Sequence, residues 1–98
     1  MADNEKILKE YVKNTATEIT DRLVIPLIDT RVNIQEKGYE IEIETKEYIA
    51  KFVGFKLKDI KHINGYTELA EWDWDFLKEF AEQISYVHEQ LLEMINNR

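Results

Sequence analysis

The sequence predicts one small α+β domain spanning residues 1–98, in which helices at the two ends pack on a three-stranded antiparallel sheet. Apolar residues recur with helical spacing near both ends of the chain, and between these segments the pattern changes to strict alternation. The composition, with 44% apolar, 34% charged and 11% aromatic residues, is that of a globular chain with a core. At 98 residues there is room for about one domain.

The first helix is expected over about residues 4–24. Its apolar residues are spaced by three or four and lie at Leu8, Val12, Ala16, Ile19 and Leu23. Asp3 or Asn4 could cap its first turn, since either side chain accepts hydrogen bonds from free backbone N–H groups. Pro26 disfavours helical geometry at the residue before it, so the helix should end near Val24.

Two alternating runs predict a β-hairpin over residues 28–45. In the first run the core-facing positions are Ile28, Thr30, Val32 and Ile34. In the second, apolar residues from Tyr39 to Ile43 alternate with Glu40, Glu42 and Glu44. Gly38 supplies the turn, and the glutamates should form a face in contact with water.

Residues 48–57 are expected to form a third strand with apolar residues on both sides, hence a covered one. Gly54 inside this run suggests a bulge or a close backbone approach. Residues 59–66 would suit either a short strand with an Asn64-Gly65 turn or a loop, and we favour an irregular connection.

The last helix should begin after a cap at Thr67, although Asp73 or Asp75 could cap a later start. Its apolar seam recurs at Leu77, Phe80, Ile84, Leu91 and Ile95.

The net charge of -7 is concentrated in the last third of the chain. Residues 1–38 hold 6 basic and 7 acidic groups, residues 39–66 hold 5 of each, and residues 67–98 hold 2 and 8. Most of these acids recur every three, four or seven residues, so they should line one helix face. Such a run can simply solubilise a domain, and acidic side chains near the start of a helix are also stabilised by the helix macrodipole. The functional interpretation is a surface for a basic partner.

Trp72 and Trp74 are two residues apart in the last helix, so both cannot face the same core. Either one is exposed, as a tryptophan at a protein interface is, or both pack under the sheet edges through a bent lead-in. The candidate partner-binding residues are Glu68, Glu71, Trp72, Asp73, Trp74, Asp75, Glu79, Glu82 and Glu89.

The sequence offers no catalytic constellation, and we expect neither enzyme activity nor a cofactor or metal. His88-Glu89 begins like a zinc-protease motif, but Leu92 stands where the second histidine is required. Ser85 is the single serine, and the three glycines are too far apart for a phosphate-binding loop. There is no cysteine and no apolar stretch typical of a signal peptide or a membrane span, so a soluble cytoplasmic protein is expected.

The predicted order of elements resembles that of the double-stranded RNA binding domain. Such domains place basic residues at the start of the second helix, where this chain has Glu71, Asp73 and Asp75, so the resemblance does not imply RNA binding. Small acidic phage inhibitors, including some anti-CRISPR proteins, and acidic immunity proteins are similar in layout.

These features predict a non-catalytic inhibitor that mimics nucleic acid and covers the basic surface of a nuclease or another nucleic-acid-binding enzyme. The alternative is a structural module that forms a homodimer. Neither nucleic acid nor a membrane is an expected partner.

Overall fold

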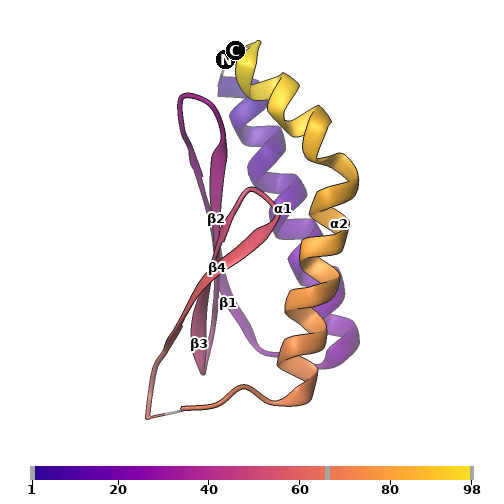
Figure 1. Cartoon of the computed structure of the whole chain (residues 1–98). Helices are drawn as coiled ribbons and strands as arrows, with labels where there is room; N and C mark the ends of the chain where they lie inside the picture. Colours follow the sequence, from indigo (N-terminus) through magenta and orange to yellow (C-terminus); the bar gives the residue numbers. More distant parts are fainter. Residues whose placement is uncertain (1, 66, 98) are drawn as a thin grey trace.

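The computed structural model describes residues 2–65 and 67–97, and it confirms an α+β domain with an antiparallel sheet and a helix at each end (Figure 1). The elements follow the order α1 (Ala2–Leu23), β1 (Leu27–Ile34), β2 (Tyr39–Thr45), β3 (Tyr48–Val53), β4 (Lys56–His62) and α2 (Glu71–Asn96). The sheet therefore has four strands where three were predicted. All neighbouring strands are antiparallel and follow the chain order β1-β2-β3-β4.

Both helices lie on the same face of the sheet, side by side and in opposite directions (Figure 1). Near the chain ends the Asn4 side-chain amide donates to the Met94 carbonyl at 3.1 Å, and at the other end of the pair Arg22 forms an ion pair with Glu79. The core lies between the helices and the sheet. Its buried residues from the two central strands are Tyr39, Ile41, Ile43, Tyr48, Ala50 and Phe52.

The predicted third strand is in fact two strands joined by a tight turn at Gly54. Gly54 has a φ of +61°, whereas Phe55 stays outside the left-handed region, which is the combination that a type II′ hairpin requires. Val53 then pairs with Lys56, and the chain returns as β4. The predicted bulge at Gly54 is therefore wrong, but the alternative, a close backbone approach, is confirmed, since a Cβ there would lie 3.2 Å from His88 Cε1. The predicted irregular connection is wrong for residues 59–62, which belong to β4, and confirmed for residues 63–65. Tyr66 lies outside the described residues. The pairing of β3 with β4 does contain an irregularity further from the turn, where Lys51 pairs with Asp59 but Phe52 pairs with Leu57.

Strand β1 also contains a bulge, which changes the prediction for its first residue. Leu27 pairs with Thr45 and Asp29 with Glu44, so Ile28 is an extra residue without a partner on β2. Its side chain is 56% exposed instead of facing the core. Beyond the bulge the alternation holds, with Val32 and Ile34 packed against the core.

Helix α1 ends with a Schellman motif in which valine occupies the position that glycine usually takes. The N–H of Ile25 donates to the Thr20 carbonyl at 2.8 Å, and the N–H of Val24 donates to the Asp21 carbonyl at 3.3 Å. Val24 has a φ of +57° and its side chain is 86% exposed. At the other end α1 begins at Ala2 and already includes both Asp3 and Asn4, so the predicted cap at either residue is wrong.

Candidate protein-binding site

The site begins at the first turn of α2, which is capped by Asp73. The helix starts at Glu71 with Ala70 as its N-cap residue, so the predicted N-caps Thr67, Asp73 and Asp75 are all wrong, and Asp73 is the third residue of the helix. Ala70 has no polar side chain, but the Asp73 carboxylate accepts a hydrogen bond from the Ala70 N–H at 3.3 Å. This hydrogen bond is the acidic half of a capping box, and it holds Asp73 against the segment that leads into the helix.

Asp73 is the one residue of the predicted set that the structure buries, with 3% of its surface exposed. It also accepts a hydrogen bond from the Tyr48 hydroxyl at 3.4 Å, and burial together with this carboxylate raises the pKa of Tyr48. A partner could not reach Asp73, so it is removed from the binding surface. It is instead the residue that positions the two tryptophans.

Trp72 and Trp74 both lie on the outside of the helix, on its two flanks. Successive residues of an α-helix are rotated by about 100°, so with Asp73 directed inward its two neighbours must point to either side of the core face. The side chains of Trp72 and Trp74 are 58% and 46% exposed. The expectation of at least one exposed tryptophan is therefore confirmed, and the alternative in which both pack under the sheet is wrong.

The acidic residues of α2 form a row along its outer surface. Asp75, Glu82 and Glu89 are seven residues apart, so they lie in line two turns from one another, and all three are exposed. Glu71 and Glu93, four residues from the ends of this line, extend it and are exposed as well. We call these five residues the acidic row. Lys78 is the only lysine or arginine of α2 over Glu71–Asn96.

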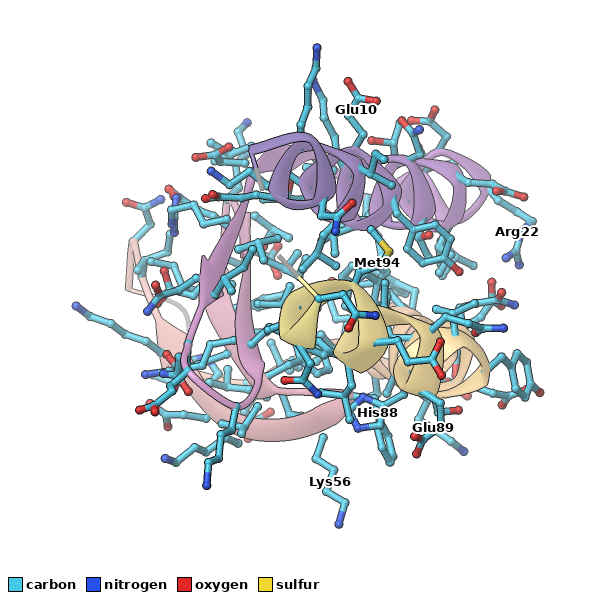
Figure 2. All side chains as sticks on the ribbon, turned by 90° about the horizontal axis from the view of Figure 1, so that it is seen from above. Glu10, Arg22, Lys56, His88, Glu89 and Met94 are labelled. Carbon is cyan, nitrogen blue, oxygen red and sulfur yellow. The ribbon has the colours of Figure 1, made fainter. Side chains whose placement is uncertain are left out.

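Glu79 and Glu68 are the two remaining acids of the predicted set. Glu79 is partly covered by its ion pair with Arg22 of α1, which is directed toward α2 in Figure 2. Glu68 is exposed in the segment that leads into the helix. Glu79 is therefore the less available of the two.

Tyr86 is a surface residue that the sequence reasoning gave no role. Its ring is 67% exposed, and its hydroxyl donates to a Glu82 carboxylate oxygen at 2.6 Å. This hydrogen bond and the charge of Glu82 raise the pKa of the Tyr86 phenol. The spacing of four residues from Glu82 was the signal in the sequence, since such residues are neighbours on a helix.

Several acidic residues outside the acidic row have basic partners. On the outer face of the sheet Arg31 forms ion pairs at 3.0 Å with Asp29, Glu42 and Glu44, and Lys51 approaches Glu40 at 3.7 Å. The predicted carboxylate face of the hairpin is thus largely neutralised. Among the described residues none of the five carboxylates of the acidic row forms an ion pair, so the row keeps its negative charge at the surface of α2.

Across residues 2–65 and 67–97, no group of three or more histidine, aspartate or glutamate side chains is arranged to hold a metal ion. None of the helices that are described is long and apolar enough to cross a membrane. Comparisons with protein-family models, with curated proteins and with solved structures found no match to this chain.

Proposed function

We propose that this chain is a non-catalytic inhibitor of the kind that phages and mobile elements encode, acting in the cytoplasm. Its acidic row and its two exposed tryptophans cover the basic nucleic-acid-binding surface of a host enzyme such as a nuclease. The observation that carries the proposal is the placement of Trp72 and Trp74 on the flanks of an uncompensated row of carboxylates.

The two kinds of side chain have different roles in such a complex. Carboxylates one or two turns apart present repeated negative charge, as a phosphate backbone does, to a groove lined by lysine and arginine. Their attraction accelerates association and makes it dependent on salt. An exposed tryptophan supplies a large contact area with little rotamer entropy to lose, and its ring attracts arginine and lysine cations.

The test begins with capture of partners from a host lysate by four forms of the protein. These are the wild type, Trp72→Ala/Trp74→Ala, Glu82→Lys/Glu89→Lys, and the control Glu10→Lys/Glu36→Lys. The control has the same change in net charge at two exposed residues outside the acidic row. We expect the wild type and the control to retain the same nucleic-acid-binding enzyme, and the other two forms to lose it.

The kinetics of the captured pair then decide between charge mimicry and another mode of binding. We expect the association rate to fall at least about tenfold between low and physiological salt, and a DNA or RNA substrate to compete with the inhibitor. An association rate that does not depend on salt, or that is the same for Glu82→Lys/Glu89→Lys as for the control, would contradict the proposal.

Self-association through the free edge of β1 is the second candidate function. The N–H of Gln35 donates to the Gly38 carbonyl. Because hydrogen-bonded pairs alternate in an antiparallel ladder, the odd-numbered residues of β1 bond to β2. The backbone groups of Val32 and Ile34 are therefore directed to the open edge. Two apolar residues close to it in sequence are also exposed: Val24, three residues before β1, and Ile28, at its bulge. An open edge of this kind can pair with a second copy.

Light scattering over a range of concentrations tests this alternative. A dimer that becomes a monomer on Val24→Lys/Ile28→Lys substitution would support it. A wild-type protein that stays monomeric at high concentration would eliminate it.

A further inference from the structure

A second surface lies at the C-terminal half of α2, and its charge is opposite in sign to that of the acidic row. The turn between β1 and β2, the turn between β3 and β4, and α2 surround a hollow of about 490 Å³. This volume lies within the range of small-molecule sites. The lining residues are Gln35, Lys37, Gly38, Tyr39, Val53, Gly54, Phe55, Lys56, His88 and Leu92.

The His88 imidazole is held in a fixed position on the wall of this hollow. Its Nδ1 lies 2.6 Å from the hydroxyl of Tyr39, a residue that is 2% exposed. The Phe55 ring meets the imidazole edge-on, with centroids 4.9 Å apart. Gly54 allows this arrangement, because a Cβ there would lie 3.2 Å from His88 Cε1. Among the described residues nothing is bonded to Nε2, so this nitrogen is available to a ligand.

The lining carries positive charge and no carboxylate, although the whole chain has a net charge of -7. Lys37 lies in the turn between β1 and β2, Lys56 is the first residue of β4, and both are exposed. Figure 2 shows Lys56 and His88 on the same side of the molecule. The Lys56 ammonium lies 5.9 Å from the Phe55 ring centroid, so the cation sits over an aromatic surface. Glu36 and Glu89 are neighbours in sequence, but neither lines the hollow.

We propose that this hollow binds a small organic anion. Its anionic group lies between Lys37 and Lys56 and accepts a hydrogen bond from His88 Nε2. Its apolar part lies against Phe55 and Leu92, which supply the uncharged wall. An anion is attracted by the two lysines, whereas a cation would be repelled by them. This site is independent of the function proposed for the acidic row, which involves other residues.

The experiment is an NMR titration of the ¹⁵N-labelled protein with phenyl phosphate. We expect saturable shifts centred on Gly38, Gly54 and His88. Benzylamine, which has a similar ring and a positive charge, should cause no saturable shift at these residues. Inorganic phosphate should bind more weakly than phenyl phosphate, because it lacks the apolar part that contacts Phe55.

Charge reversal at the two lysines is compared with the same change elsewhere. Lys37→Glu/Lys56→Glu should weaken phenyl phosphate binding at least about tenfold, while Lys58→Glu/Lys61→Glu, on exposed residues outside the lining, should leave it within about twofold. Unchanged amide shifts elsewhere would show that each variant is folded. Equal weakening by both pairs, equal affinity for benzylamine, or no saturable shift with phenyl phosphate would overturn the proposal. Equal affinity for inorganic phosphate would overturn the assignment of an organic ligand.

Discussion

Replacing Val24 with glycine should stabilise the protein, because this valine has a backbone conformation that suits residues without a Cβ. Val24 has a φ of +57° at the end of α1. A Cβ in the left-handed region costs about 1–2 kcal/mol, and a β-branched side chain is among the least tolerant of it. The two hydrogen bonds of the Schellman motif come from backbone groups, so glycine would keep both.

The expected gain follows from three contributions. Glycine relieves the steric cost of about 1–2 kcal/mol. Its greater freedom in the unfolded chain offsets about 0.4–1 kcal/mol of that gain. Loss of the valine side chain costs little burial, since 86% of its surface is exposed. We therefore expect Val24→Gly to raise the free energy of unfolding by about 1 kcal/mol.

Urea unfolding followed by circular dichroism measures this change. With an m-value of about 1–3 kcal/mol/M, the midpoint should rise by about 0.3–1 M at an unchanged m-value. Val24→Ala is the matched control, because alanine also lacks branching but keeps the Cβ. It should stay within about 0.5 kcal/mol of the wild type. If alanine stabilised as much as glycine, or glycine not at all, backbone strain at this residue would be refuted.

Three further predictions concern buried contacts. Asp73→Ala removes the acceptor of two hydrogen bonds, one from the Ala70 N–H and one from the Tyr48 hydroxyl, so it should lower the free energy of unfolding by about 2 kcal/mol in urea titrations. A loss below about 0.5 kcal/mol would contradict the capping role. Burial raises the pKa of Tyr39 from 10.0 to about 12. The contribution of the protonated phenol to the free energy of unfolding is therefore fully present below pH 10, and it should fall by about 2–3 kcal/mol as the pH rises to 12. Tyr39→Phe should remove this part of the pH profile. Gly54→Ala introduces a Cβ at positive φ, 3.2 Å from His88 Cε1, and should lower the free energy of unfolding by about 1–3 kcal/mol. The control Gly38→Ala, where nothing lies within 4 Å of the new Cβ, should change it by less than about 0.5 kcal/mol. Equal effects of the two substitutions would show that the space at Gly54 is not limiting.

The two helices and the first hairpin could be predicted because each buries one side of a regular pattern. In α2 the seam from Leu77 to Ile95 recurs every three or four residues, and in β2 buried and half-buried residues alternate from Tyr39 to Thr45. Such patterns identify a helix or strand directly, since the period of the side chains is the period of the backbone.

Strand β4 could not be predicted from its pattern because little of it is buried. Lys58, Asp59 and Lys61 are exposed, and Ile60 is only half-buried, so the strand lacks a clear apolar side. Its turn was also difficult to recognise, because Gly54 lies in a run where apolar Phe52, Val53, Phe55 and Leu57 suggested a continuous strand. The hairpin depends on the backbone conformation of Gly54, which composition does not reveal.

In the candidate site, Trp72, Trp74 and most of the predicted acids are exposed as the sequence predicted, whereas Asp73 is buried. A carboxylate in the first turn of a helix can face water or can cap the backbone, and the charge pattern alone treats both alike. The hydrogen bond to Tyr48 comes from a strand 25 residues earlier in the chain, and only the folded structure brings the two together. The same holds for the pairing of Glu79 with Arg22.

The antiparallel pairing of α1 and α2 brings the two ends of the described chain to one pole of a molecule with dimensions of 41 × 23 × 19 Å (Figure 1). Trp72 and Trp74 lie near the start of α2, which is at the opposite pole. A tag, a surface linkage or a fused domain at either end would therefore leave the tryptophans accessible. The protein can be immobilised through its termini with its candidate binding face directed into solution.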